Sequence, residues 1–442
     1  MSLPAPVAWA PGEEPERPPD HIAPGAPDPG GTAAAAGLAA ATLLTNLVAL
    51  AATLVFTRLL GSDGYGALAA LINVSVILFV PGAALQVAVA REGALGRLGD
   101  RAAMAAALAR WEREVPLVAL AIAVVAVLAR EPLAALLGVD EAWAAAAVPV
   151  TAGLFLLVSL QRGMLQAERR YRAVGGSMVG EAVVRLAFGV ALVAAGLDVT
   201  GAYVAMLGSM LATSAWLAWV LRRVLGPAAP REDAPPLRAL AAATIVPTIA
   251  LTALAVLQNV DVILARHALP DDLAGAYAAA TVAAKALLWV AVGVGMWVLP
   301  EAVRRAADGG DARTVLLRAF AVVGAVALPA LPVFALAPDV LMRTAFGPEF
   351  EEGADVLLVL GAAYGLLAVG YLSVQFLLGV GARGFLVVLG AAALAEPLLL
   401  LFTDDLETFA AIVAGVLASV AAALLLMALR PARGRPAAAP RG

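Results

Sequence analysis

The residue with the clearest chemical potential is Lys285, the single lysine among 29 basic residues, which lies in the middle of an apolar segment. The segment 272–300 reads DLAGAYAAATVAAKALLWVAVGVGMWVLP, and about 20 apolar residues are enough for a helix to cross a bilayer. A cation at the bilayer centre costs at least about 2.5–3.5 kcal/mol on insertion scales, so it faces protein or a water-filled cavity. A lysine ammonium binds phosphate as a point charge, which permits weak and reversible holding. Lys285 is therefore a candidate ligand for an anionic group, and the alternative is a structural ion pair with Glu181 or Glu396 on a neighbouring helix.

Two more charged residues, Glu181 and Arg185, are four positions apart in another apolar segment, and so share one face of a helix. They either neutralise one another and ease insertion, or Arg185 adds a second contact to an anionic group while Glu181 tunes it. Glu396, which precedes Pro397, is isolated in a third apolar segment. It is either a site for a proton or a sodium ion, or the partner of Lys285.

The remaining candidate residues lie near the ends of apolar segments. Asp261 is close to one end of its segment, where it either caps or gates a cavity or contacts the membrane interface. Arg58, Arg266 and Arg91 also mark the ends of apolar segments. Their guanidinium groups attract anionic head groups, although arginines that snorkel to the interface have the same sequence pattern.

The composition excludes several other kinds of chemistry. Of the 442 residues, 62% are hydrophobic and 14% are charged, whereas soluble domains contain about 25% charged residues. The chain is therefore predicted to be a polytopic membrane protein with little room for an aqueous domain. It has no cysteine and two histidines, His21 and His267, so it lacks thiolate chemistry and the ligands of an ordinary zinc or haem site. We expect no metal, no cofactor, no nucleic-acid partner and no enzymatic activity.

Hydropathy predicts twelve membrane-spanning helices. The expected helices span roughly 33–57, 65–90, 115–129 (or from about Ala102), 142–161, 175–196, 200–221, 239–264, 273–299, 317–337, 354–380, 384–402 and 406–429. Basic residues concentrate between alternate pairs of these helices, with 23 of the 29 on one side of the membrane. The positive-inside rule then places both termini in the cytoplasm.

An internal repeat divides the chain into two halves. TRLLGSDGYGALAAL follows the first predicted helix and ARHALPDDLAGAYAAAT follows the seventh, with Gly66 and Gly275 209 positions apart (275 − 66). LAREPLAALLG and LAPDVLMRTAFG end at Gly138 and Gly347, again 209 apart. Each repeat contains six helices, an even number, so the halves run parallel and are related by an axis along the membrane normal.

We therefore predict an all-α integral membrane protein with 12 transmembrane helices in two parallel six-helix lobes around a central cavity. The expected lobes are 32–223 and 239–430, joined by a Pro-rich cytosolic linker, 224–238. Residues 1–31, which are rich in Pro, Gly and acidic residues, are expected to form a disordered cytosolic tail, and 431–442 a second cytosolic tail. Two lobes around a cavity suit alternating access, in which one lobe rocks against the other.

Four motifs in fixed order complete the description. TRLLGSDGYGALAAL follows the first predicted helix, and QRGMLQAERRYRAVGGSMVGEAVVRLAFGV covers 161–190. The stretch 259–305 has an Asp near its outer end, an AGAY opening and a closing LPE, and LMRTAFGPEFEEGADVLLVLG covers 341–361. In this order and topology, the sequence from about 33 to 429 resembles the bacterial polysaccharide flippases of O-antigen and capsule type. These belong to the multidrug/oligosaccharidyl-lipid/polysaccharide exporter superfamily.

The resemblance implies a transporter of the bacterial inner membrane that flips polyprenyl-pyrophosphate-linked oligosaccharide from the inner to the outer leaflet, for cell-surface polysaccharide biosynthesis. It implies the lipid-linked oligosaccharide and membrane lipids as binding partners, with a polysaccharide polymerase and glycosyltransferases as protein partners. The residues expected to bind substrate in the lumen are Lys285, Arg185, Arg58, Arg266 and Arg91. Those expected to act in coupling or gating are Glu396, Glu181 and Asp261.

Three alternatives stay open. A multidrug/cation antiporter of the same superfamily would need an acidic residue in the cavity of the first lobe, and the first predicted helix has none. A membrane glycosyltransferase or ligase would need long outer loops and acidic catalytic motifs, whereas the paired acids 271–272 and 404–405 are typical of solvated turns. A membrane scaffold without transport activity is the third alternative.

Overall fold

The computed structural model of the protein describes residues 29–94, 98–227, 245–307, 313–380 and 382–429. These residues form helices and short connections, and no strand occurs among them. Most of both predicted tails and most of the predicted linker 224–238 lie outside the described residues.

The first lobe is built from helices, two of whose breaks are at glycine. Its elements are α1 (Pro29–Ala94), α2 (Arg101–Leu128), α3 (Arg130–Leu137), α4 (Ala142–Ala167), α5 (Tyr171–Leu192), the π-helical turn η1 (Val193–Leu197) and α6 (Asp198–Leu225). Helix α1 is broken at Gly61, where φ is 72°, and η1 contains Gly196 with φ 85°. Glycine adopts positive φ without steric cost, so α1 consists of two segments joined at Gly61, and α5 is joined to α6 at Gly196.

The second lobe repeats this order of elements. It consists of α8 (Ile245–Ala268), α9 (Asp271–Ala307), α10 (Arg313–Leu336), α11 (Pro338–Ala345), the 3₁₀ turn η3 (Pro348–Gly353), α12 (Ala354–Gly379), α13 (Phe385–Leu400) and α14 (Leu406–Leu429). Helix α11 begins 208 residues after α3 (338 − 130), and α14 begins 208 residues after α6 (406 − 198). The motif glycines Gly138 and Gly347, which directly follow the motif around α3 and α11, both have positive φ. The repeated sequence therefore corresponds to a repeated order of helices.

The helices are long and apolar enough for twelve membrane crossings. Eight stretches of the described residues qualify as spans, and two of these, 40–93 and 171–225, contain 54 and 55 residues. At 1.5 Å per residue each is about 80 Å long, so each supplies two crossings of a bilayer core of about 30 Å. The bent pair α2 and α3 adds one crossing and the 16-residue α13 another. Eight stretches, two of them double, with these two additions give twelve, as predicted.

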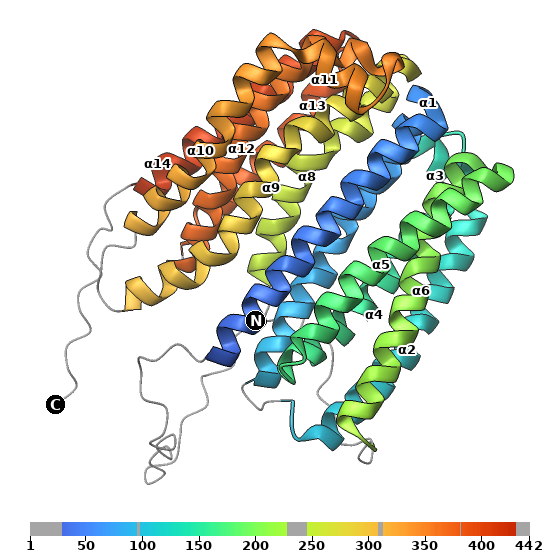
Figure 1. The fold of residues 1–442 in the computed structure, drawn as a ribbon, viewed down its shortest axis with the longest axis vertical. Coiled ribbons are helices and arrows are strands. Elements are labelled where there is room, and N and C mark those ends of the chain that lie inside the picture. The colour runs from blue at the N-terminus through green and yellow to red at the C-terminus, as the bar shows by residue number, and fades with distance from the viewer. Residues whose placement is uncertain (1–28, 95–97, 228–244, 308–312, 381, 430–442) are drawn as a thin grey trace, which may run out of the picture.

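The two lobes meet at one end and separate toward the other. Figure 1 shows α1–α6, coloured blue to green, beside α8–α14, coloured yellow to red, with the lobes in contact near α3 and α11 and apart at the opposite end. Between the lobes, α1 packs against α8 and α9. We call the contacting end the α3/α11 end.

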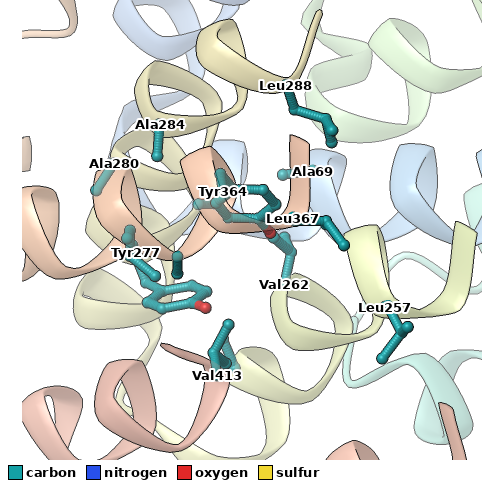
Figure 2. Close-up of a cluster of buried hydrophobic side chains, with 14 of the residues drawn as sticks. Ala69, Leu257, Val262, Tyr277, Ala280, Ala284, Leu288, Tyr364, Leu367 and Val413 are labelled. Atoms are coloured by element: carbon teal, nitrogen blue, oxygen red, sulfur yellow. The ribbon is translucent and has the colours of Figure 1, made fainter. Parts of the chain in front are cut away.

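Buried apolar side chains connect the helices within and between the lobes. One cluster extends over both lobes and includes residues of α1, α4, α8, α9 and α12; part of it, including Ala69 of α1 and Tyr364 of α12, is shown in Figure 2. A second cluster in the first lobe joins α2, α4 and α6 around the fully buried Trp111. Many large apolar residues on the outward faces are exposed, for example Leu120 and Leu128 of α2, as expected for surfaces that contact lipid.

Candidate functional site

Lys285 lies on α9 between the two lobes, and its side chain is bonded to both. The residue is 8% exposed, and its Nζ donates to Oδ1 of Asn73 on α1 at 3.0 Å and to Oδ1 of Asn259 on α8 at 3.4 Å. Each asparagine donates its own amide to the carbonyl four residues earlier, of Ala69 and Ala255, at 2.7 Å in both cases. These bonds turn both Oδ1 atoms toward the ammonium, so one neutral amide from each lobe holds it.

No carboxylate of the described residues lies within 4.0 Å of the Lys285 ammonium, so neither predicted ion pair, with Glu181 or with Glu396, is formed. The ammonium instead lies 5.5 Å from the ring centroid of Tyr364 on α12, a distance at which the face of an aromatic ring attracts a cation. Amide oxygens and an aromatic face are therefore the direct neighbours of the Lys285 ammonium, and no carboxylate of the described residues pairs with it at short range.

Asp261 and Glu396 form a separate group of buried acids in the second lobe. Asp261 on α8 is fully buried, and its Oδ2 accepts hydrogen bonds from the hydroxyls of Tyr277 and Tyr364, both at 2.8 Å. Figure 2 shows both tyrosines within the buried apolar cluster. Oδ1 of Asp261, both carboxyl oxygens of Glu396 and Oγ1 of Thr281 are buried without a hydrogen-bond partner. The two acids interact electrostatically with one another and with Lys285, so the structure brings three of the predicted site residues into one region.

Glu181 pairs with a residue that the sequence analysis placed outside the helices. Its Oε2 accepts from Nη2 of Arg162 on α4 at 2.8 Å, and Nε of Arg162 donates to Oγ of Ser177 at 2.9 Å. The expected pairing of Glu181 with Arg185 is therefore replaced by Arg162, because α4 continues to Ala167 and carries Arg162 inward. Arg185 keeps only a longer-range electrostatic interaction with Glu181.

Arg185 and Lys285 lie on two different helices that both pack against α1. Helix α5, which carries Arg185, packs against α1 and α6, and α1 in turn packs against α9. Figure 1 shows α1 between α5 and α9. Neither Arg185 nor Lys285 has an ion-pair partner within 4.0 Å among the described residues, and the structure shows no direct contact between the two.

The arginines near the ends of the spans occupy different surroundings. Arg58 donates from Nη2 to the carbonyl of Thr344 at 3.1 Å, which is a contact between lobes at the α3/α11 end. Arg266 pairs with Asp63 of the first lobe at 2.8 Å at the same end. Arg91, which is exposed, lies near the end of α1 and pairs with its neighbour Glu92 at 3.6 Å. None of these three arginines is placed beside Lys285.

Breaking the Arg162–Glu181 pair is expected to destabilise the protein strongly. Arg162→Leu leaves Glu181 as a largely buried, unpaired carboxylate, and breaking a buried pair in this way costs up to about 3–5 kcal/mol in stability. We expect a clear fall in the unfolding temperature of the purified protein, measured by tryptophan fluorescence. Arg185→Leu, which removes no short ion pair, is the matched control. Equal unfolding temperatures for the two variants would contradict a structural role of the pair.

Comparison with known proteins bears on the fold. No family model and no curated protein matches this sequence. Among solved structures, the chain is similar to the inward-facing conformation of a multidrug resistance MATE family transporter of the MOP superfamily, with TM-score 0.73 and 16% identity over 87% of this chain and 93% of that one. It is also similar to the outward-facing conformation of such a transporter, with TM-score 0.65 and 14% identity over 89% and 94%.

A further similar structure is a MOP superfamily transporter from Pyrococcus furiosus, with TM-score 0.57 and 15% identity over 90% of this chain and 94% of that one. For that protein, a reversed polarity of the binding pocket is taken to suggest a different function. At these identities the comparison establishes the fold alone. The chain has the two-lobed, all-helical fold of MATE transporters.

Proposed function

We propose that the protein is a transporter that flips polyprenyl-pyrophosphate-linked oligosaccharide from the inner to the outer leaflet of a bacterial inner membrane. The observation that supports this function best is the Lys285 ammonium, which is held between the lobes by two neutral amides. A pyrophosphate that crosses the membrane inside a protein needs a compensating cation, since its charge is strongly disfavoured in a medium of low dielectric constant. Asn73 and Asn259 would then become free to bind sugar hydroxyls.

The charge of the first lobe supports an anionic substrate as well. Arg162 neutralises Glu181, whereas Arg185 has no short-range partner among the described residues. In this proposal Arg185 is the cation that the first lobe offers to an anionic substrate, at a place apart from Lys285. In this proposal the α3/α11 end faces the outside of the cell, both termini are cytoplasmic, and a polysaccharide polymerase and glycosyltransferases are the protein partners.

A multidrug/cation antiporter is the second candidate, and it is favoured by one specific observation. The carboxyl oxygens of Asp261 and Glu396 include three that are buried without a partner, and such oxygens could bind a cation. Both acids lie in the second lobe, however, and Lys285 interacts with them electrostatically. We therefore assign Asp261 and Glu396 to coupling, as the site of a proton or sodium ion.

The function is tested by a flipping assay in liposomes. The purified protein is reconstituted with a fluorescent polyprenyl-pyrophosphate oligosaccharide, and the exposure of the label in the outer leaflet is followed with and without proton and sodium gradients. Flipping above the rate of protein-free liposomes is the expected result. Export of a cationic dye without any flipping, for a panel of oligosaccharides, would overturn the proposal in favour of the antiporter.

Glu396→Gln is expected to remove the dependence of transport on the ion gradient. Glutamine has the shape of glutamate but neither gains nor loses a proton, so flipping should continue at the rate seen without a gradient. The measurement is the ratio of flipping rates with and without the gradient, which should fall to about one. Glu407→Gln, an exposed position at the start of α14, is the control and should keep the ratio of the unmodified protein. A ratio unchanged by Glu396→Gln would exclude this coupling site.

A further inference from the structure

Arg266 binds carboxylates from both lobes at the α3/α11 end. Its side chain is 5% exposed, and Nη1 lies 2.8 Å from Oδ1 of Asp63 on α1 and 3.1 Å from Oδ1 of Asp271 on α9. Its Nε donates to the carbonyl of Gly138, which follows α3, at 3.3 Å. Asp63 and Gly138 belong to the first lobe, whereas Asp271 belongs to the same lobe as Arg266. The Arg266 guanidinium therefore binds Asp271, which belongs to its own lobe, and Asp63, which belongs to the opposite lobe.

The backbones of the two lobes touch beside this arginine. A Cβ on Gly66 of α1 would lie 3.1 Å from the backbone nitrogen of Gly275 on α9, and a Cβ on Gly275 would overlap the carbonyl oxygen of Ser62. A side chain at either position would separate the helices. The bond between Arg266 and Asp63 joins the two lobes beside this contact, so it breaks when the lobes part.

The two carboxylates differ in what they do when the lobes part. Both are largely exposed, at 65% for Asp63 and 64% for Asp271, so Asp63 can be released into water at little cost. The nearly buried guanidinium would be costly to leave unpaired, but Asp271 stays with it on the second lobe. Burial also raises the pKa of the nearby Glu141 carboxyl, whose charge interacts with Arg266 and Asp63.

We propose that Arg266, Asp63 and Asp271 form a partner-exchange latch that holds the α3/α11 end closed. In the closed state Arg266 is shared between the two carboxylates. In the open state it is bound by Asp271 alone, and Asp63 is in water. Asp63 therefore favours the closed state, and Asp271 favours the open state, whatever the cargo. This inference concerns opening of the lobes and does not depend on the proposed substrate.

The latch predicts that neutralising the two carboxylates has opposite effects. Asp63→Asn removes the partner that Arg266 has only when the α3/α11 end is closed. It should raise the ratio of open to closed molecules about fivefold. Asp271→Asn leaves Arg266 without its partner in the open state and should lower the ratio by a similar factor. These factors correspond to about 1 kcal/mol, the upper value typical of a surface ion pair. Arg343→Gln, which breaks the Arg343–Glu351 pair within the second lobe, is the matched control and should leave the ratio unchanged.

The ratio is measured by pulsed electron paramagnetic resonance on the full chain. The sequence has no cysteine, so Leu136→Cys on α3 and Val340→Cys on α11, both exposed, provide a unique pair of spin labels across the two lobes. Distance distributions in lipid nanodiscs give the two populations. Opposite shifts for Asp63→Asn and Asp271→Asn support the latch. Shifts in the same direction, no shift in either variant, or an equal shift in Arg343→Gln would overturn it.

Discussion

Lys285→Ala is expected to reduce flipping strongly while folded protein remains in the membrane. A hydrogen bond that involves a charged group contributes about 1.5–3 kcal/mol, and each 1.4 kcal/mol corresponds to a tenfold change, so the flipping rate should fall about 10- to 150-fold. The fold should survive because both direct partners of Lys285, the Oδ1 atoms of Asn73 and Asn259, are neutral. The flipping assay and the yield of monodisperse protein measure the two effects separately.

Two further variants separate the charge of Lys285 from its position. Lys285→Arg keeps the charge and should retain part of the activity. Asn73→Ala removes the bond to the first lobe but keeps the ammonium, so it should reduce flipping less than Lys285→Ala. Normal flipping by a well-expressed Lys285→Ala protein would exclude a role in substrate binding. Loss of folded protein would show instead that the electrostatic interaction with Asp261 and Glu396 is structural.

Gly275→Ala is expected to prevent the α3/α11 end from closing. The added Cβ would overlap the carbonyl oxygen of Ser62, a backbone atom of the opposite lobe. Overpacking of this kind typically costs about 1–3 kcal/mol, which corresponds to about a 5- to 150-fold shift toward molecules with this end open. We expect the distance between spin labels at 136 and 340 to increase. Flipping should fall because the transporter cannot return to the state in which the α3/α11 end is closed.

Gly293→Ala is the matched control for this prediction. Gly293 is on the same helix, and a Cβ there would meet nothing within 4 Å, so both the distance and the flipping rate should stay unchanged. If Gly275→Ala flipped substrate at the normal rate with an unchanged distance distribution, the close contact between the lobes would have no part in the transport cycle.

Much of the fold could be predicted because membrane insertion and internal repetition leave strong signals in sequence. Long apolar segments gave the twelve helices, and the paired glycines Gly66 and Gly275 identified the repeat. The glycines recur for a physical reason, since the two backbones approach too closely for any side chain. Helix α13 has 16 residues and is shorter than the helix 384–402 that hydropathy predicted.

The partners of the charged residues could not be predicted in the same way. Hydropathy ended the fourth helix at its first charge and so placed Arg162 in a loop, whereas the bond to Glu181 lets the helix continue to Ala167. The cost of a buried cation correctly indicated that Lys285 lies inside the protein, but the amides that hold it come from helices distant in sequence. For Arg58 and Arg266, the sequence indicated that each lies near the end of a membrane-spanning helix. It did not indicate which residues of the opposite lobe they contact.

The place of Lys285 between the lobes also gives the chain a chemical reporter of its own motion. Apart from the amino terminus, this is the protein's only primary amine. It is 8% exposed while the lobes hold it, and acylating reagents require an accessible, uncharged amine. The reactivity of this one atom therefore records the opening of the lobes in the unmodified protein, and mass spectrometry can read that record from a single peptide in intact cells.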